Sequence, residues 1–358
     1  MSEGVKPKYK LTEVGVIPVD WPFKPLVQLC AFITKGSTPT TYGFTWQQSG
    51  VLFLRSECVS EVGLDLAQSM FISEAAHATL RRSEVTNGDI LITITGNVGR
   101  VVLLAGFGTG NVNQHIARIR VVAPEADVRF VFHYLSRPES RRRFESITTG
   151  QAYPQISLQQ VREAEIPLPP LPEQRAIAAA LSDVDALLAK LDQLIAKKRD
   201  LKQAAMQQLL TGQTRLPGFS GEWEYKLIRS LGETYGGLMG KTKADFGHGA
   251  ARYIPFMNVM SDTVIDPEWL EPVDILPTEA QNLALKGDLF FNGSSETPEE
   301  VGYCSVLMHN IPRLYLNSFC FGFRFYSDAN ANGLFLAYWF RSISGRRAMS
   351  ALAQGATR

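Results

Sequence analysis

Short polar clusters follow several strand-like runs of this sequence, and their chemistry suits contacts with phosphate. The first is the turn Lys35-Gly36-Ser37-Thr38-Pro39, which combines a cation, two hydroxyls and free backbone amides. Proteins use these groups to hold the phosphates of nucleic acids. A similar cluster, Gly240-Lys241-Thr242-Lys243, lies in the second half of the chain. The sequence therefore predicts two phosphate-contacting turns, whose candidate residues are Lys35, Ser37, Thr38, Lys241, Thr242 and Lys243.

Two further polar residues stand at places that look equivalent. Arg55 follows the strand-like residues 51–54, and Asn258 lies 203 residues further along the chain. Arginine pairs with guanine, and asparagine with adenine, through two hydrogen bonds each. We therefore predict that Arg55 and Asn258 are counterparts that read different bases of a DNA duplex.

More polar residues gather in loops that separate the predicted strands. Taken singly, each of them is more typical of a turn or a cap than of a binding site. The same groups occur in both halves of the chain, and this repetition favours a function. The candidate DNA contacts of this kind are Asn97, Arg100, Asn113, Gln114, His115, Asn292 and Asn317.

Two arginine pairs, Arg142-Arg143 and Arg346-Arg347, lie in segments with helical character. A helix end attracts cations because its dipole is negative there, so a solvated helix terminus explains these residues as well as DNA contact does. Both alternatives stay open, and the four arginines complete the set of candidate DNA contacts.

The sequence carries no catalytic constellation. It has no HExxH, no GxSxG, no P-loop and no Asp/Asn-Pro-Pro-aromatic tetrapeptide. The glycine-rich stretch 106–110 leads into a predicted strand rather than a helix, which indicates a hairpin loop instead of a nucleotide site. The five histidines are scattered and the four cysteines form no CxxC pair. We expect no enzyme activity, no metal and no cofactor in this chain.

The elements that must position the polar residues are short strands and a few helices. Residues 51–54, 89–94, 100–104 and 116–122 are rich in β-branched side chains and predict strands, and residues 131–146 predict a helix. The second half of the chain has the same texture. The fold class that this pattern predicts is α+β, with two similar mixed α/β domains.

An internal repeat supports that prediction. Trp21 and Trp223 are 202 residues apart, and Gly88-Asp89 and Gly287-Asp288 are 199 apart. Further landmarks repeat at an offset close to these: Gly99 with Gly302, Asn113 with Asn317, Arg120 with Arg324, and Arg142-Arg143 with Arg346-Arg347. So many matches favour a duplicated unit over coincidence.

A long helix, over residues 171–212, separates the two halves of the sequence. Prolines precede it, and no proline other than Pro172 and no glycine interrupts it before Gly212, a plausible C-terminal cap. Its apolar residues recur at spacings of three and four, which is typical of a coiled-coil seam. We expect a helix–helix interface at Ile177, Leu181, Val184, Leu188, Leu191, Ile195 and Leu201.

The composition is that of a folded protein. The chain has 358 residues, of which 45% are hydrophobic and 20% charged, and this length suits two domains. Because the formal net charge is only +1, affinity for nucleic acid must come from local patches. Cys30, Cys58, Cys304 and Cys320 look like reduced core thiols, and no signal peptide or membrane span is evident. These features predict a cytoplasmic protein.

Three stretches carry a family resemblance. Residues 166–175 read IPLPPLPEQR and lead into the long helix, residues 212–219 read GQTRLPGF, and residues 15–21 read GVIPVDW. With these motifs the chain resembles the specificity subunit of Type I restriction-modification systems. The resemblance implies a first target-recognition domain over residues 1–165, a conserved spacer helix over 166–213 and a second target-recognition domain over 214–358.

The resemblance also implies a function and partners. In that family each target-recognition domain reads half of a split site in double-stranded DNA, and the paired helices set the gap. The subunit itself is not catalytic. It binds modification subunits that methylate adenine and, through them, restriction subunits that translocate DNA with ATP. The alternative is a non-catalytic scaffold for other proteins.

The repeat predicts a second long helix beyond the second domain, and the sequence stops at Arg358 before reaching it. A stripe of large apolar residues does not remain in water. Two outcomes are open: the long helix docks on a second polypeptide, or it folds back onto the globular units. We favour the first, with another copy of this chain or a separately encoded half as the partner.

Overall fold

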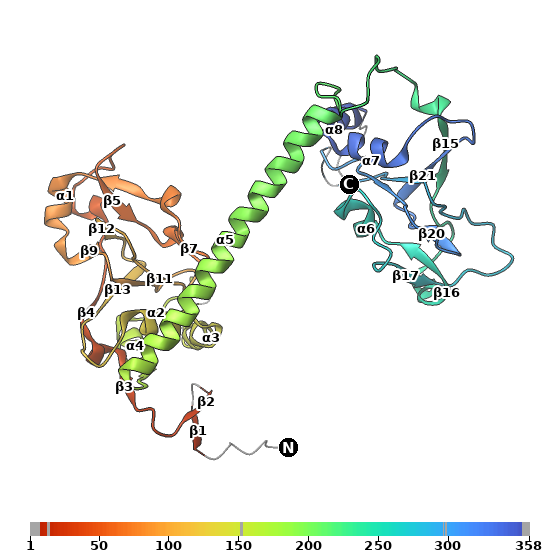
Figure 1. Cartoon of the computed structure of the whole chain (residues 1–358). Coiled ribbons are helices and arrows are strands. Elements are labelled where there is room, and N and C mark those ends of the chain that lie inside the picture. The colour runs from red at the N-terminus through yellow and green to blue at the C-terminus, as the bar shows by residue number, and fades with distance from the viewer. Residues whose placement is uncertain (1–7, 13–14, 151–152, 296, 298, 353–358) are drawn as a thin grey trace. The chain divides into compact units, whose positions relative to one another are not determined.

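The computed structural model describes residues 8–12, 15–150, 153–295, 297 and 299–352. The chain divides into two compact units, Met1–Lys190 (unit 1) and Leu191–Arg358 (unit 2). The helix α5 (Leu171–Leu209) is 39 residues long and contributes its first half to unit 1 and its second half to unit 2 (Figure 1). The helix predicted over residues 171–212 is thus confirmed to within three residues, and Gly212 follows it with a positive φ of 74°.

Unit 1 is built on a four-stranded antiparallel sheet. Its strand order is β11 (Val101–Leu103), β10 (Ile90–Thr93), β13 (Ile116–Val121) and β4 (Cys30–Lys35). All four residues of β10 are buried because the sheet is covered on both faces, which explains the continuous apolar run of this strand. One face packs against α2 (Val128–Ser136), α3 (Pro138–Ser146) and α4 (Leu158–Arg162).

A second sheet covers the other face. Its order is β8 (Met70–Ile72), β5 (Val51–Leu54), β12 (Thr109–Val112) and β9 (Glu84–Thr86), with β5 and β12 parallel. Buried residues such as Leu54, Leu91 and Val112 join the two sheets. Besides short 3-10 helices, the other described strands and α-helix of unit 1 are β1 (Tyr9–Thr12), β2 (Gly15–Pro18), β3 (Phe23–Pro25), β6 (Val59–Ser60), β7 (Gly63–Leu64), α1 (Glu74–Thr79) and β14 (Glu165–Pro167).

Unit 2 has the same architecture. Its first sheet has the order β19 (Cys304–Val306), β18 (Leu289–Asn292), β21 (Cys320–Phe325) and β15 (Gly232–Gly236). Its second sheet has the order β17 (Glu271–Val273), β16 (Phe246–Ile254) and β20 (Leu314–Leu316), with β16 and β20 parallel. The helices of unit 2 are α6 (Phe256–Ser261), α7 (Gly333–Arg341) and α8 (Ile343–Ser350).

The internal repeat is confirmed, because the four strands of the first sheet and three strands of the second sheet follow one another in the same order in both units; β9 has no counterpart among the described strands of unit 2. An ion pair is repeated as well: Arg120 Nε lies 2.6 Å from Asp89 Oδ1, and Arg324 Nη2 lies 2.6 Å from Asp288 Oδ2. Both carboxylates are nearly inaccessible to solvent. The hydrogen bond to Asp89 raises the pKa of Arg120, and the bond to Asp288 does the same for Arg324. The fold thus consists of two similar mixed α/β units and one long helix.

The prediction that Arg55 and Asn258 are counterparts is wrong. In the parallel pairs, Leu54 lies opposite Val112 and Ile254 lies opposite Leu316, so the residue equivalent to Arg55 is Pro255. Asn258 occupies the place of Cys58 instead and lies in the core of unit 2. Arg55 and Asn258 therefore do not occupy equivalent positions at which the two units could read different bases.

The equivalence of Arg142-Arg143 with Arg346-Arg347 is wrong by one residue. Ser140 donates a hydrogen bond to Tyr134 O, whereas the equivalent close approach in unit 2 joins Gly345 and Trp339 O, where an added Cβ would lie at 2.1 Å. The caps Asp127 and Asn332 of α2 and α7 give the same offset. Arg346-Arg347 is thus the counterpart of Arg141-Arg142. Residues 353–358, where the repeat would continue, lie outside the described residues.

The other predicted elements agree with the structure, with one difference. The strands over residues 51–54, 89–94, 100–104 and 116–122 appear as β5, β10, β11 and β13. The single helix expected over residues 131–146 is two helices, α2 and α3. The chain breaks at Arg137, which has an extended conformation, because Pro138 at the first position of α3 disfavours a helical residue before it.

Gln174 fixes the beginning of α5 to unit 1. Its side chain is fully buried, and its Oε1 accepts a hydrogen bond of 2.9 Å from Asp127 N. Its Nε2 donates bonds of 2.8 Å to Glu125 O and to Pro169 O. One turn later, Ile177 and Ala178 pack on the hydrophobic core. These contacts make the first turns of α5 an integral part of unit 1.

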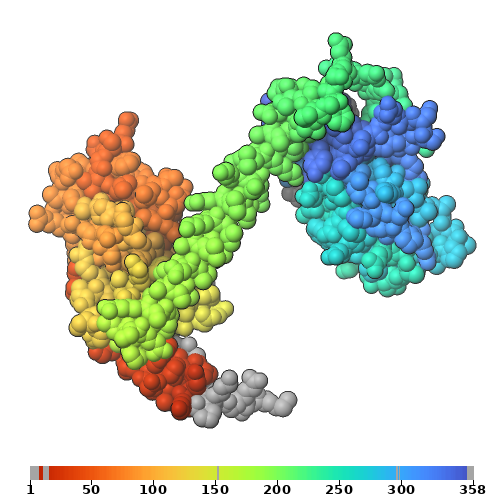
Figure 2. All heavy atoms as spheres, viewed as in Figure 1, coloured from red at the N-terminus to blue at the C-terminus, as the bar shows by residue number. Residues whose placement is uncertain are grey.

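Most of the predicted helix interface is exposed in the single chain. Ile177 packs on unit 1, but the large apolar side chains along the middle of α5 are about half exposed. Figure 2 shows the surface of this helix between its two ends. They are Leu181, Val184, Leu188, Leu191, Ile195 and Leu201, together with Leu187 and Leu194. A helix–helix interface at these residues stays a prediction.

Candidate nucleic-acid interface

Several strand ends of unit 1 meet at one edge. The ends of the parallel strands β5 and β12 lie together, since Leu54 is the partner of Val112. The ends of β4 and β10 both lie beside the beginning of β13, which follows β12 after a three-residue turn. We call the residues that leave these strands the loop edge of unit 1; they are residues 35–38, 55–57, 95–97 and 113–115. Most of the candidate DNA contacts of unit 1 lie on it.

A glycine brings two of these loops into contact. Gly36 N donates to Ile116 O at 3.3 Å, and Ser37 N donates to Val112 O at the same distance. A Cβ at Gly36 would lie only 1.8 Å from Val112 O, so no other residue fits this position. The close backbone approach places residues 35–38 directly against residues 113–115.

The side chains of these two loops form one polar surface. Thr38 Oγ1 donates a short hydrogen bond to Gln114 Oε1, and Gln114 Nε2 lies 3.0 Å from His115 Nε2. Lys35 is exposed beside them. An amide, an imidazole and a hydroxyl supply both the hydrogen-bond donors and the acceptors that base edges require. The lysine can form an ion pair with a phosphate.

The other candidate DNA contacts of these loops differ in whether their side chains are already engaged in hydrogen bonds or ion pairs. Asn97 is exposed on the loop after β10, and its carbonyl accepts a bond from Thr93 Oγ1. Arg55 Nε and Nη2 both donate to Gln68 O, at 3.3 and 3.1 Å. Arg100 lies off the edge and faces Glu61, with 3.7 Å between the charged groups. Asn113 is buried, and its Oδ1 accepts a bond from His115 N that holds the turn.

Unit 2 has an equivalent loop edge, formed by residues 237–239, 255–257, 293–295 and 317–319. A Cβ at Gly237 would lie 2.0 Å from Asn317 O, so this glycine repeats the role of Gly36. Leu238 N donates to Leu316 O at 2.8 Å, and Asn317 N donates to Ile254 O at 3.2 Å. The backbones of the two edges are therefore built alike.

The asparagines predicted as DNA contacts in unit 2 are buried and hydrogen-bonded to the backbone. Asn258 Nδ2 donates to Asp266 O and Trp269 O, and its Oδ1 accepts from Asp266 N. Asn292 and Asn317 hold the loops that follow β18 and β20 in the same manner. The structure gives Asn292 and Asn317 a part in shaping the loop edge and Asn258 a part in the core beside α6, and direct contact of the three with DNA stays a prediction.

The cationic turn of unit 2 is partly neutralised. Lys241 is largely buried and lies 2.6 Å from Glu279, whose pKa is lowered by this bond. Thr242 caps a short 3-10 helix (Lys243–Asp245): its side chain accepts a hydrogen bond from the backbone of Asp245, and its Oγ1 donates one to Asp245 Oδ2. Lys243 is exposed. Of the three predicted phosphate contacts, Lys243 is thus the one whose charge faces solvent without an ion pair among the described residues.

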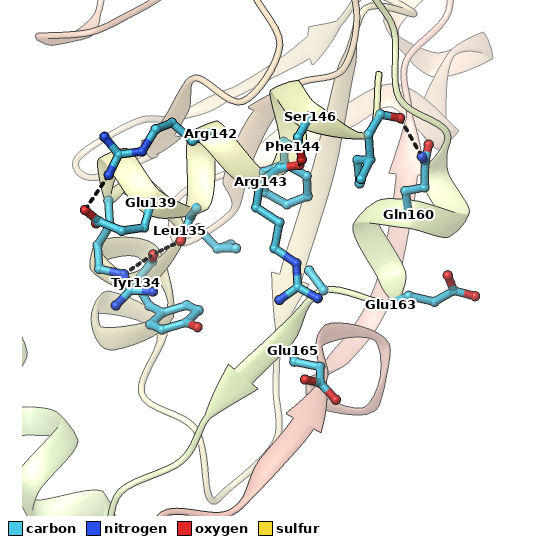
Figure 3. A pocket seen from close by; sticks show the side chains of 14 residues that line it. Tyr134, Leu135, Glu139, Arg142, Arg143, Phe144, Ser146, Gln160, Glu163 and Glu165 are labelled. Carbon is cyan, nitrogen blue, oxygen red and sulfur yellow. Dashed lines mark hydrogen bonds and ion pairs between the residues drawn. The ribbon is translucent and has the colours of Figure 1, made fainter. Parts of the chain in front are cut away.

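The arginine pairs lie on the helices that cover the first sheet of each unit. Arg142 turns to Glu139 at 2.8 Å, whereas Arg143 extends into a pocket of about 610 Å³ above Glu165 (Figure 3). In unit 2, Arg346 Nη2 donates to Glu299 O and Val301 O, and burial lowers its pKa. Arg347 is exposed. None of the four is placed on a loop edge by the strand pairing.

Several exposed side chains on or beside the loop edges carried no signal in the sequence. In unit 1, Tyr153 lies beside the loop edge and meets the His115 ring edge to face, with 6.2 Å between the ring centres, and is 58% exposed. In unit 2, the exposed residues are Met239, Met257 and Phe319. Isolated apolar residues in loops give no periodic signal, so only the strand pairing reveals that they share an edge.

The described residues hold no group of three or more His, Cys, Asp or Glu side chains that could bind a metal ion. No helix in the same part of the chain is long and apolar enough to cross a membrane. Three of the four thiols are buried and Cys30 is half-buried. Desolvation raises the pKa of Cys30 to about 12 and that of Cys320 to about 11, which makes both unreactive near neutral pH.

A match to a family model identifies the family of this chain. Residues 18–198, about half of the chain, match the model of the Type I restriction modification DNA specificity domain. The chain belongs to this family. The match begins just before β3 and ends within α5, so it takes in the loop edge of unit 1.

Known specificity subunits resemble this member of the family in part of their length. The MjaX type I specificity subunit of Methanocaldococcus jannaschii is 29% identical over 209 residues, which are 58% of this chain and 47% of that protein. The EcoBI specificity subunit of Escherichia coli is 24% identical over 210 residues, or 55% and 43% of the two chains. The chain thus spans about half the length of the curated relatives that it matches.

Solved structures of specificity subunits share the fold. The S subunit of a Type I restriction-modification system from M. genitalium matches with a TM-score of 0.57 at 16% identity, over 97% of this chain and 82% of that one. A structure from a study of type I R-M complex assembly matches with a TM-score of 0.55 at 17% identity, over 95% and 83% of the two chains. The likeness at these identities is one of fold.

Proposed function

We propose that this chain is the DNA sequence-recognition subunit of a Type I restriction-modification complex. Each unit reads one half of a bipartite site in double-stranded DNA through its loop edge. The observation that carries the proposal is that one backbone edge is built twice, around Gly36 and Gly237, and presents different side chains each time. A duplicated reader with altered side chains suits a target made of two unlike halves.

The accessible polar groups on the loop edge of unit 1, which are half-buried or exposed, have two tasks. Gln114, His115 and Thr38 read base edges, with Asn97 and Arg55 beside them, because amide, imidazole and guanidinium groups discriminate bases by hydrogen bonding. Lys35 and, in unit 2, Lys243 contact phosphates and fix the register on the duplex. Recognition, rather than catalysis, is the role of this chain.

The domain limits of residues 1–165 and 214–358, with the spacer over 166–213, belong to this proposal. So do the partners: modification subunits that dock on the helix and methylate adenine, restriction subunits that they recruit, and a second specificity chain that covers the exposed stripe of α5. The cytoplasm, where the DNA is, is the expected location. A scaffold for proteins alone has no specific observation in its favour, because the polar groups of unit 1 gather at strand ends suited to base readout.

The test is sequence-selective binding by the purified full chain. A randomised duplex library is partitioned on the chain, and the affinity for a selected duplex is compared with that for a scrambled one at several salt concentrations. Gln114→Ala should relax one position and cost about 1–3 kcal/mol on the selected duplex, because it removes a base contact. Lys35→Ala should weaken all duplexes alike and lower the salt slope by about 0.9.

Gln208→Ala is the matched control, since Gln208 is an exposed glutamine of α5. It should leave both the preferred sequence and the affinity unchanged. Equal affinity of the parent chain for selected and scrambled duplexes would reject the proposal.

A further inference from the structure

The loop edge of unit 2 displays three large apolar side chains. Met239, Met257 and Phe319 are exposed by 61%, 55% and 61%. Each follows a different strand: Met239 lies beyond the end of β15, Met257 in the first turn of α6 beyond β16, and Phe319 beyond β20. Exposed apolar residues that gather at one edge mark a contact surface more often than scattered ones do.

The equivalent positions of unit 1 are polar. Because Gly36 corresponds to Gly237, Thr38 corresponds to Met239, and because Asn113 corresponds to Asn317, His115 corresponds to Phe319. The strand pairing likewise places Glu57 at the position of Met257. The two edges have the same backbone arrangement but different side chains. A ligand of the same kind therefore contacts hydrogen-bonding groups in unit 1 and apolar side chains in unit 2.

The backbone of the apolar edge is held firmly. Gln281 brackets Met239, accepting from its N at 3.0 Å and donating to its O at 2.8 Å. Phe319 N donates to Asn317 Oδ1 at 2.9 Å, and Phe319 O accepts from Gly293 N at 3.0 Å. A contact that is fixed before binding loses less conformational entropy when the ligand arrives.

We infer that the loop edge of unit 2 recognises the 5-methyl group of thymine through Phe319 and Met239. This inference rests on the proposed function, since it takes double-stranded DNA as the ligand. The major groove presents donors, acceptors and one apolar group, which is the methyl group on C5 of thymine. Apolar side chains at a base-reading edge therefore select thymine positions, and the half-site of unit 2 is richer in them than the half-site of unit 1.

The experiment uses the full chain and the duplex that it selects from a randomised library. The half-site of unit 1 is the one whose preference is relaxed by Gln114→Ala, and the other belongs to unit 2. Thymines are replaced by uracil one at a time, which removes only the methyl group. Each contacted methyl in the unit 2 half should cost about fourfold in affinity, the value expected for one buried methylene-sized group.

A double variant introduces the residues of unit 1. Met239→Thr with Phe319→His should abolish the sensitivity to uracil in the unit 2 half and leave the unit 1 half as it is. Met308→Thr is the matched control, because Met308 is an exposed methionine that follows β19 at the opposite end of the sheet from the loop edge. The control should retain the sensitivity, and all variants should melt like the parent since the changed residues are exposed.

Two results would overturn the inference. One is a unit 2 half-site without thymine, or one whose thymines tolerate uracil with unchanged affinity. The other is a double variant that keeps its sensitivity to uracil. Failure of the proposed function is a different result, namely that the chain selects no duplex sequence at all.

Discussion

Gln174 offers the sharpest test of how α5 is attached to unit 1. Its side chain is inaccessible to solvent and makes three hydrogen bonds to the backbone, with Asp127 N, Glu125 O and Pro169 O. A typical buried hydrogen bond contributes about 1 kcal/mol, and a buried partner left unpaired costs about as much or more. Gln174→Ala should therefore destabilise the attachment by about 3 kcal/mol.

Two comparisons separate hydrogen bonding from packing. Gln174→Met keeps most of the side-chain volume but removes all three bonds, so it should be nearly as destabilising as Gln174→Ala. Gln203→Ala makes the same change at an exposed glutamine of the same helix and should cost less than about 0.5 kcal/mol. Both comparisons use the full chain.

Hydrogen exchange followed by mass spectrometry is the suitable assay. Peptides covering residues 171–182 should exchange about 100-fold faster in Gln174→Ala than in the parent, since about 3 kcal/mol corresponds to roughly that factor in the opening equilibrium. Peptides from unit 2 should exchange at the parent rate. Equal protection of residues 171–182 in Gln174→Ala and Gln203→Ala would show that the buried amide does not hold the helix.

Two further predictions concern α5 and its neighbour α2. Leu188 is exposed in the single chain, so Leu188→Asp should leave the stability of the monomer unchanged. The same substitution should weaken association of chains through the helix by several kcal/mol, because it buries a charge in the interface. Unchanged light scattering across a dilution series would contradict this prediction. Burial lowers the pKa of His133, so its neutral form stabilises unit 1 fully above about pH 6.5, and this stabilisation is lost as the pH falls toward the lowered value. The urea midpoint should drop more steeply below about pH 6.5 in the parent than in His133→Gln, and parallel curves would exclude the effect.

The sequence predicted the strands, the repeat and the long helix because each rests on a local run or on a regular spacing of residues. The strands β5, β10, β11 and β13 are short, largely apolar runs, and α5 has a regular apolar stripe with no glycine. The duplication could be recognised because Asp89 and Arg120 recur as a pair in Asp288 and Arg324. Ion pairs buried at a carboxylate are difficult to replace one partner at a time.

A constant offset, however, did not locate equivalent residues between the landmarks. The offset is 202 at Trp21, 200 at the end of β5 and 199 at Asp89, and it rises to 204 at Asn113. Loops of different lengths cause these changes, and only strand register reveals them. The offset of 203 therefore paired Arg55 with Asn258, although the parallel strands pair it with Pro255.

Composition also does not distinguish an exposed amide from a capping one. Gln114 is only half-buried on the loop edge, whereas Asn258 and Asn292 are fully buried and bonded to backbone groups. Both kinds follow strands, and asparagine is common in turns because its side chain mimics the backbone. Burial is set by the packing of elements distant in sequence, which is why the candidate contacts could be gathered to one edge but not ranked beforehand.

Gly36 and Gly237 have a consequence for how this protein can change over generations. Each glycine allows a close approach of two backbone segments, and buried asparagines hold the turns beside it, so the shape of the edge does not depend on the side chains two positions after the glycine. Substitutions at Thr38 or Met239, and at His115 or Phe319, can therefore alter what the edge displays at little cost in folding stability. The backbone of each edge is a fixed scaffold on which side chains can be exchanged. A new specificity then requires only new side chains, whereas loss of either glycine would disrupt the shape of the edge.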